Sequence, residues 1–212
     1  SDRVQGLPSG QRAVDYHQSL LVEADLVITS SEVLQRRIQP QRPDVRLIPN
    51  GVDLAHFTPA PPPANPAPVI GFHGAVAAWF DLDLLAEVAR LRPGYQFRLI
   101  GPASISLATL TRLSNVTHRQ TVPYEKITNQ VARFDVGILP FKLTDLTHAV
   151  RPLKVLEYLA MGVPVVATSL EELCDWPGVI LADLPEDFAV AIDQALLSEN
   201  GLRNDEQVRI FV

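Results

Sequence analysis

Cysteine is almost absent from this 212-residue sequence, with Cys174 as the single example. One cysteine excludes a disulfide within the chain and a metal site built from several thiolates, and it fits a reducing compartment. No apolar run reaches the ~18 residues that a membrane-spanning helix needs, and no pattern of a secretory signal opens the chain. The sequence therefore predicts a cytoplasmic protein without a membrane span.

Basic clusters are also lacking. The formal net charge is -6, and residues 171–212 hold ten acidic but two basic side chains. We interpret this acidic tail as solvated helix surface. No dense basic stripe with interleaved aromatic residues occurs, which argues against nucleic-acid binding. The histidines show no spacing typical of metal ligands. We therefore expect neither a nucleic-acid partner nor a metal site.

Proline is concentrated in residues 59–68, which contain six prolines. Proline cannot donate a backbone hydrogen bond and favours extended geometry, so this stretch predicts a semi-rigid linker, although a long surface loop within one domain would have the same composition. Before it, strands are expected at residues 24–29 and 45–48, and Ser30-Ser31 can cap a helix between them that runs through Arg37. Sixty residues with so few strands make a poor independent core, so this part is expected to need a partner.

After the proline-rich stretch, strands and helices alternate. Strands are predicted at 69–72, 96–100, 115–118, 135–139, 163–167 and 179–181. Helices are predicted at 82–91, 104–113, 123–133, from Pro152 to a stop at Gly162, and at 186–197. This alternation predicts an α/β fold, a Rossmann-like parallel sheet with helices on both faces, beside a partial second α/β segment. Such sheets bind ligands at the carboxyl ends of their strands, where the longest loop here is residues 140–150.

The helix that begins at Pro152 has an unusual charge pattern. Arg151 precedes it and Lys154 lies in its first turn, although a helix N-terminus already carries about half a positive charge. An anion such as a diphosphate would turn this cost into a binding site; otherwise both side chains extend into solvent. Glu157 shares a helix face with Lys154. It forms either a surface ion pair or an acceptor for the paired hydroxyls of a ribose.

The segment Pro152-Leu-Lys-Val-Leu-Glu157, with its continuation to Thr168, resembles the C-terminal donor-site signature of GT-B glycosyltransferases. It is most similar to the group 1 enzymes, of the glycosyltransferase family 4 type, which use nucleotide diphosphate sugars. Three further stretches resemble the same family in the same order: residues 24–31 with 48–57, residues 69–74 and residues 135–141. The resemblance spans about residues 20–198.

The resemblance implies a domain organisation. Residues 1–58 would be a remnant of the N-terminal acceptor domain with the crossover, residues 59–68 the linker, and residues 69–198 the nucleotide-sugar donor-binding domain. Residues 199–212 would start the C-terminal crossover helix. In the family, the acceptor and most catalytic groups belong to the N-terminal domain, so this chain alone is predicted to be inactive.

The family also implies an activity. A hexosyl group would pass from a UDP- or GDP-sugar to a glycan or lipid-linked acceptor, with retention of configuration, during synthesis of a surface polysaccharide. The resemblance implies no metal or other cofactor. It places the full-length enzyme at the inner face of the membrane, as a peripheral protein.

Site residues follow from the matched positions. Arg151 and Lys154 are predicted to be catalytic, because they would stabilise the leaving diphosphate. Glu157 corresponds to the ribose ligand, and the backbone around Leu153 and Lys154 to the diphosphate cradle. The remaining predicted donor contacts are Gly74, Tyr124 and His148.

Two departures from the family pattern keep other functions open. Ala149 stands where many relatives carry a glutamate that contacts the sugar, and residues 75–80 lack the usual Arg and Lys. The first departure supports a non-catalytic scaffold module that binds nucleotide sugars. Another GT-B enzyme, such as a sugar-nucleotide epimerase, is the remaining alternative.

Overall fold

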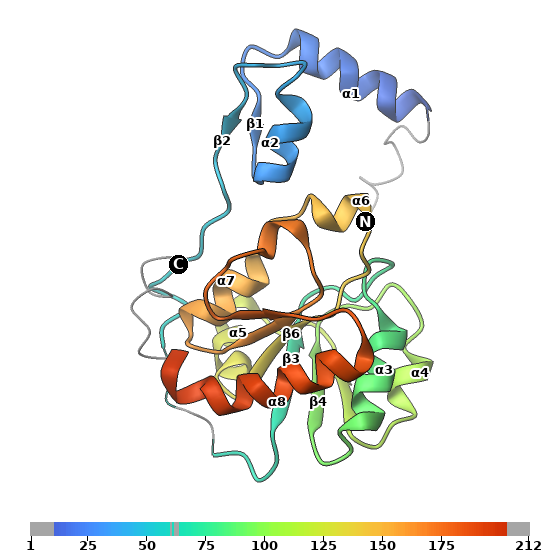
Figure 1. Ribbon diagram of the computed structural model, residues 1–212, viewed down its shortest axis with the longest axis vertical. Helices are drawn as coiled ribbons and strands as arrows, with labels where there is room; N and C mark the ends of the chain where they lie inside the picture. The colour runs from blue at the N-terminus through green and yellow to red at the C-terminus, as the bar shows by residue number, and fades with distance from the viewer. Residues whose placement is uncertain (1–10, 60, 62–63, 203–212) are drawn as a thin grey trace. The chain divides into compact units, whose positions relative to one another are not determined.

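The computed structural model describes residues 11–59, 61 and 64–202, and it divides the chain into two compact units, Ser1–Pro49 and Asn50–Val212 (Figure 1). Each unit has its own elements and is described by itself. Most of the crossover helix predicted at 199–212 lies outside the described residues.

The described residues of the first unit form two helices and two short strands. In order these are α1 (Gln11–Glu23), β1 (Ile28–Thr29), α2 (Glu32–Ile38) and β2 (Arg46–Leu47). The strands pair in parallel, and Ser31 caps α2 as predicted, because its hydroxyl accepts the Leu34 N–H at 3.1 Å. Both strands are shorter than predicted, since the partner strand sets where a ladder ends and the sequence does not reveal that partner.

The second unit is built on a six-stranded, fully parallel sheet, in agreement with the predicted fold class. Its strands are β3 (Val69–His73), β4 (Gln96–Ile100), β5 (Val116–Arg119), β6 (Val136–Leu139), β7 (Val165–Ala167) and β8 (Val179–Leu181). The spatial order is β5-β4-β3-β6-β7-β8. The chain therefore leaves β3 toward one edge and returns to build the other half from β6. A crevice at the carboxyl ends of β3 and β6 is the expected ligand site of such a sheet.

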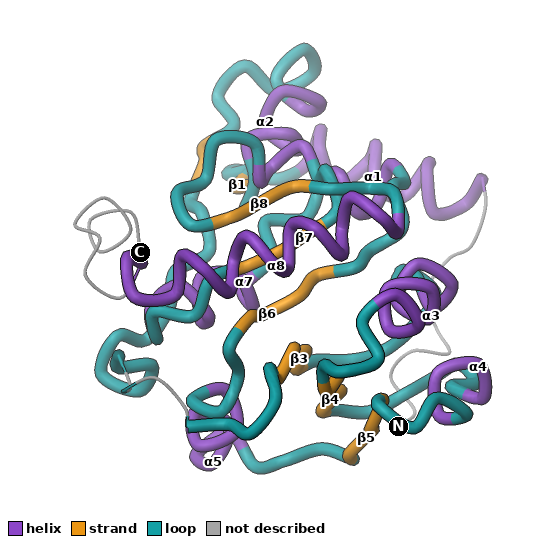
Figure 2. Tube along the Cα trace, turned by 60° about the horizontal axis from the view of Figure 1, so that its bottom comes forward, coloured by secondary structure: helices purple, strands orange, loops and turns teal. Residues whose placement is uncertain are grey.

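Helices cover both faces of this sheet (Figure 2). They are α3 (Leu82–Leu91), α4 (Ala108–Thr111), α5 (Tyr124–Val131), α6 (Asp145–His148), α7 (Leu153–Ala160) and α8 (Pro185–Leu202), with a 3₁₀ turn at Glu171–Leu173. Right-handed crossovers place α3 and α4 on one face and α5 and α7 on the other. Helix α8 returns to the first face and packs against α3.

Several predicted helix limits are corrected by capping details. Pro152 is the N-cap of α7 and not its first residue, while Gly162 ends the helix as predicted, with φ +73°. Residues 104–113 form only the short α4, whose N-cap, Leu107, offers no side-chain hydrogen bond. The predicted loop 140–150 contains α6, which a reciprocal capping box between Thr144 and Thr147 stabilises.

The boundary between the units lies after Pro49 and not at residues 59–68. Phe57 is 1% exposed in the core of the second unit, so the segment that precedes the proline-rich stretch packs with the sheet. The side chain of Asn65 also donates to the Arg133 carbonyl at 3.1 Å and the Asp135 carboxylate at 2.9 Å. Residues 50–58 thus pack with the second unit, and the origin of residues 1–58 as a remnant of an acceptor domain with its crossover stays a prediction.

Tyr158 fixes the position of α7 on the sheet. Its ring is fully buried over Gly137 of β6, where a Cβ atom would come within 2.6 Å of the ring. Its hydroxyl accepts the backbone N–H of His73 at 2.9 Å. A glycine in one strand and a hydrogen bond to another thus set the distance between α7 and the end of β3.

Candidate functional site

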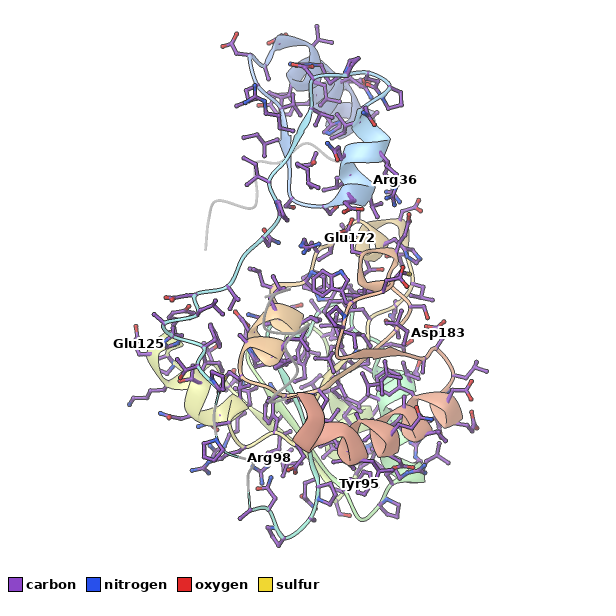
Figure 3. The ribbon with its side chains drawn as sticks, turned by 60° about the vertical axis from the view of Figure 1, so that its left-hand side comes forward. Arg36, Tyr95, Arg98, Glu125, Glu172 and Asp183 are labelled. Atoms are coloured by element: carbon purple, nitrogen blue, oxygen red, sulfur yellow. The ribbon has the colours of Figure 1, made fainter. Side chains whose placement is uncertain are left out.

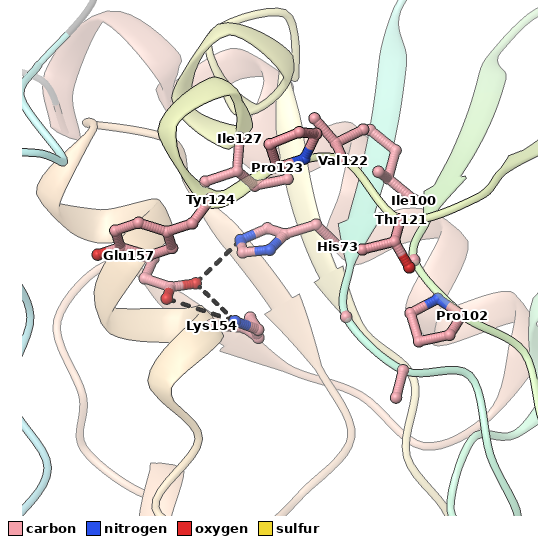
Figure 4. A pocket seen from close by; sticks show the side chains of 13 residues that line it. His73, Ile100, Pro102, Thr121, Val122, Pro123, Tyr124, Ile127, Lys154 and Glu157 are labelled. Carbon is pink, nitrogen blue, oxygen red and sulfur yellow. Dashed lines mark hydrogen bonds and ion pairs between the residues drawn. The ribbon is translucent and has the colours of Figure 1, made fainter. Parts of the chain in front are cut away.

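A pocket of about 390 Å³ opens at the carboxyl ends of β3 and β4, beside the first turns of α7 (Figure 4). It shares the carboxyl end of β3 with the crevice that the sheet topology predicts and extends from there toward β4. Its lining residues come from β3, β4, the loop after β5, α5 and α7: His73, Gly74, Ala75, Ile100, Gly101, Pro102, Thr121, Val122, Pro123, Tyr124, Ile127, Lys154 and Glu157.

Two glycines form part of the pocket wall with bare backbone. Gly74 follows β3 with φ +144°, and Gly101 follows β4 with φ +138°, conformations that side chains disfavour. The Gly74 N–H donates to the Ile100 carbonyl at 2.8 Å. A Cβ atom on Gly101 would overlap the Gly74 carbonyl oxygen. The two turns are therefore nested, and their backbone is open to a ligand.

Three charged or titratable side chains meet in the pocket (Figure 4). The Glu157 carboxylate lies 3.0 Å and 3.3 Å from the Lys154 ammonium, and 3.0 Å from Nε2 of His73. His73 and Glu157 are both buried. Nε2 has no partner with good hydrogen-bond alignment among the described residues, so its contact with Glu157 is short but bent.

Burial and neighbouring charges set the protonation of this group. Burial alone would raise the pKa of Glu157, but the contact with His73 and the charge of Lys154 hold that pKa below its ordinary value. Burial lowers the pKa of His73 more than the carboxylate raises it. The pocket thus holds an ionised Glu157, a neutral His73 and the ammonium group of Lys154.

The N-terminus of α7 faces the same pocket through Lys154. No side chain caps this helix, and its first turn contains no acidic residue. Its first N–H groups and the Lys154 ammonium group therefore favour an anion, as the charge pattern of the sequence predicted.

An apolar wall lies across from these charges. It consists of Val122, Pro123, Tyr124 and Ile127. The Tyr124 ring is exposed and stacks on the ring of His56, with centroids 4.4 Å apart. His56 Nε2 also lies 3.0 Å from the Tyr124 carbonyl. The pocket thereby joins an anion-attracting end to an apolar wall suited to a planar group.

The pocket brings together four of the seven predicted site residues, and their roles stay predictions. Gly74, Tyr124, Lys154 and Glu157 line it. Leu153, in the same first turn as Lys154, does not.

Arg151 and His148 are held outside the pocket lining. The Arg151 guanidinium lies 4.4 Å from the Trp176 ring centroid and 3.8 Å from the Glu172 carboxylate. His148 accepts the Glu171 N–H at 3.3 Å through Nδ1. Both side chains thus contact the loop after β7.

Two pocket residues escaped the sequence analysis. Both lie in loops at strand ends, where a ligand site was expected, but neither residue was assigned a role of its own. A usable signal existed for each: His73 directly precedes the glycine turn of Gly74, and Gly101 directly follows a strand in the same manner.

Two further features are absent from the described part of the chain. No group of three or more His, Cys, Asp or Glu side chains gathers there in a way that would hold a metal ion. None of the helices within residues 11–202, the gaps at 60 and 62–63 aside, combines the length and the apolar content that crossing a membrane requires.

The family model described as "Glycosyl transferases group 1" matches residues 67–198, which include the whole six-stranded sheet and the pocket. The chain belongs to this family. The fold is that of the GT-B glycosyltransferases, and the resemblance noted in the sequence is confirmed.

Curated relatives of this family extend beyond the chain. TuaH of Bacillus subtilis, assigned to teichuronic acid biosynthesis as a glycosyltransferase, is 29% identical over 210 residues, covering 90% of this chain and 53% of TuaH. WcaL of Escherichia coli, assigned to colanic acid biosynthesis in the same way, is 27% identical, covering 90% of this chain and 51% of WcaL. The chain thus spans about half the length of the curated relatives it matches.

A solved structure supports the fold. HepE of Anabaena, crystallised with UDP and glucose, superposes with a TM-score of 0.70 at 16% identity, covering 95% of this chain and 62% of HepE. At this identity the likeness shows the architecture, and the ligand is a property of HepE.

Proposed function

We propose that the pocket binds a nucleotide diphosphate sugar and that the chain is the donor-binding part of a glycosyltransferase. The carrying observation is the buried, ionised Glu157 beside Lys154 at an uncapped helix N-terminus, in a chain of the group 1 family. The donor would be a UDP-sugar, because UDP is the nucleotide bound in HepE. The product would be a surface polysaccharide, as the names of TuaH and WcaL suggest.

In this proposal each part of the donor has a place in the pocket. The ionised Glu157 would accept hydrogen bonds from the two ribose hydroxyls. The α7 N-terminus and Lys154 would bind the diphosphate, with the backbone around Leu153 as the cradle. The base would lie against Val122 and Tyr124. These three places support a nucleotide diphosphate better than a single phosphate or a sugar alone.

In this proposal the protein itself meets the charge of the leaving diphosphate, without a resident metal. Lys154 already lines the pocket, so its ammonium group would stabilise charge as the sugar–phosphate bond breaks. Arg151 would join it only by leaving Trp176 and Glu172. His148 would reach the sugar only after losing its bond to Glu171.

The transfer reaction needs more protein than this chain. We propose that an N-terminal domain of the same enzyme binds the glycan or lipid-linked acceptor and that the full-length enzyme works as a peripheral protein at the inner membrane face, with retention of configuration. Chain 1–212 would then bind the donor without transferring sugar. Turnover by this chain alone would contradict that division of labour.

Calorimetric titration tests the binding proposal. The chain should bind UDP, with GDP as the comparison nucleotide, and Glu157→Gln should weaken the binding by about tenfold or more, because an ionised acceptor is lost. Glu125→Gln is the matched control: Glu125 is an exposed carboxylate at the start of α5 and does not line the pocket (Figure 3). Unchanged affinity in Glu157→Gln, or no binding of either nucleotide at millimolar concentration, would reject the assignment.

A non-catalytic binding module is the second candidate, and Ala149 favours it. Ala149 is buried after α6 and has no group that could contact a sugar by hydrogen bonding. The two candidates differ in the full-length protein. An enzyme consumes UDP-sugar when the acceptor is present, whereas a scaffold binds UDP-sugar and releases it unchanged.

A further inference from the structure

A second cavity, of about 310 Å³, lies next to the pocket just described. Its lining includes three arginines and no acidic residue: Arg98, Leu99, Ile100, Thr117, Arg119, Gln130 and Arg133. Ile100 is the one residue that lines both cavities. The lining of this arginine cavity is therefore almost entirely distinct from that of the first pocket.

Strand register explains why these side chains converge. Arg98 of β4 pairs with Thr117 of β5, and Ile100 pairs with Arg119. Side chains two residues apart on a strand share a face, so Arg98 and Arg119 are diagonal neighbours on the face that α5 covers. Arg133 follows α5, which ends at Val131. In the described sheet β5 is the edge strand, so no further strand lies beyond Thr117 and Arg119.

The charge of this cavity is not balanced by the described part of the protein. None of its three arginines has a carboxylate within 4.0 Å among the described residues, whereas Arg90 and Arg92 each have one. Charged side chains protect an edge strand from aggregation whatever their sign, and they do not have to meet at one point. Protection of the edge therefore does not explain why three arginines line the same cavity. Three like charges around one opening repel one another, and a bound anion would remove that repulsion.

We propose that the arginine cavity binds a phosphate group. The planar guanidinium presents a fork of N–H donors that matches phosphate oxygens, and the side-chain amide of Gln130 adds neutral donors to the same opening. The Thr117 hydroxyl, which donates to the Phe97 carbonyl at 3.4 Å, also borders it. The volume lies within the ~300–1,000 Å³ range of small-molecule sites. The phosphate belongs either to a soluble phosphorylated compound or to an anionic phospholipid headgroup. Neither source requires an occupied donor pocket, so this site goes beyond the function proposed above.

An NMR titration of the full chain with inorganic pyrophosphate distinguishes the two cavities. The side-chain amide of Gln130 and the backbone amide of Thr117 report on the arginine cavity, and the Gly74 and Gly101 amides report on the donor pocket. Both sets should shift in the wild type. In Arg98→Gln/Arg119→Gln, the affinity read at Gln130 should fall by about tenfold or more, while that read at Gly74 stays within about twofold.

The matched control removes the same charge elsewhere. Arg90→Gln/Arg112→Gln alters exposed arginines at α3 and α4, on the opposite sheet face, and should leave the Gln130 affinity unchanged. Thermal unfolding checks that both double variants are folded. Arg133→Gln, a change at an exposed position, provides a second test of the cavity should the first variant fail to fold.

Sedimentation with vesicles identifies the source of the phosphate. Binding to phosphatidylcholine vesicles that contain phosphatidylglycerol, lost in the cavity variants, identifies a lipid headgroup; pyrophosphate binding without vesicle binding identifies a soluble ligand. The proposal is overturned if neither probe binds at millimolar concentration, or if the control loses as much affinity as the cavity variants. Shifts at Gln130 without shifts at Gly74 would leave this site standing and count against the donor pocket alone.

Discussion

At the scale of single residues, the chemistry of the pocket depends on how His73 and Glu157 share a buried space. A neutral imidazole next to an ionised carboxylate keeps the negative charge available to a ligand's hydroxyl groups. The Lys154 ammonium group compensates that charge from the solvent side. The same buried arrangement makes folding sensitive to acid.

Replacement of His73 should flatten the pH dependence of stability. Burial lowers the pKa of His73 from 6.5. Just below pH 6.5, the imidazole therefore binds a proton in the unfolded chain but stays neutral in the folded chain. The free energy of unfolding should therefore fall as the pH drops below 6.5, by at most about 1.4 kcal/mol per pH unit, and stay level above it. Urea unfolding of the wild type and His73→Gln at about pH 5.5 and about pH 7.5 measures the difference.

A histidine on the surface supplies the control. His17→Gln alters an exposed position of α1 and should keep the wild-type slope. The depressed pKa of Glu157 acts in the same direction but below its ordinary value of 4.5, outside the window compared. Equal slopes in the wild type and His73→Gln would show that His73 is not held neutral by burial.

Gly101→Ala should damage both the fold and the pocket. The added Cβ would overlap the Gly74 carbonyl at a positive φ, so we expect a loss of about 2 kcal/mol or more in the free energy of unfolding. UDP binding should fall with it. Gly94→Ala is the control, because a Cβ there meets nothing within 4 Å. Similar urea midpoints for the two variants would contradict the nested turns.

Local and remote contacts explain which residues the sequence could place. Lys154 and Glu157 were predicted to share a face because their spacing within one helix is enough to bring them together. Arg151 was predicted to bind the donor, but its partners, Trp176 and Glu172, lie in a different loop that no local pattern connects to it. The approach of His73 to Glu157 likewise depends on tertiary structure.

At the scale of elements, one carboxylate of α8 binds side chains at the C-terminal end of α3. Asp193 accepts hydrogen bonds from the Arg92 guanidinium at 2.6 Å and 3.0 Å, and from the Tyr95 hydroxyl at 2.9 Å. The side chains of Arg92 and Asp193 are both partly exposed, so solvent screens their attraction. The fork geometry nevertheless makes this a stronger contact than a simple surface pair.

Asp193→Asn should lower the free energy of unfolding by about 1 kcal/mol, because the charge and one acceptor of the fork are lost. Glu87→Gln removes the exposed ion pair between Glu87 and Arg90 on α3 and should lower the free energy of unfolding only slightly. Urea denaturation in parallel measures both. A cost for Asp193→Asn no larger than that for Glu87→Gln would mean that α8 is held by its apolar contacts alone.

Element limits were predictable where local signals were strong. The helix at 82–91 and the strand at 96–100 match their predicted limits, since Asp81 caps the former and apolar alternation defines the latter. The short α6 was missed because its capping box lies in a segment without apolar periodicity. The helix expected at 104–113 is reduced to the short α4, because no side chain caps its N-terminus.

At the scale of the whole molecule, the second unit begins before its first strand. Composition marked residues 59–68 as the boundary, because prolines show where regular structure stops. They do not show where packing stops, and Phe57 is buried with the sheet. The fold class was thus predictable from alternation, whereas the unit boundary depends on long-range contacts of Phe57 and its neighbours that composition does not reveal.

A chain that begins at Asn50 should fold and bind nucleotide like residues 1–212, whereas one that begins at Pro59 should be less stable. The shorter chain loses Phe57, whose truncation alone in Phe57→Ala should cost about 3–5 kcal/mol. Leu54→Ala, at an exposed position of the same segment, should change little. Thermal melting of the four proteins is the measurement, and equal melting temperatures for the Asn50 and Pro59 chains would refute the boundary.

The fit of the Tyr158 ring over Gly137 has an evolutionary consequence. A strand residue larger than glycine and a tyrosine on the helix cannot occupy that space together. Relatives that acquired a side chain at position 137 must therefore have shrunk the aromatic group at position 158 in the same lineage. Those that did so also gave up the hydroxyl that holds the end of β3, so the buried His73 N–H must have gained another acceptor.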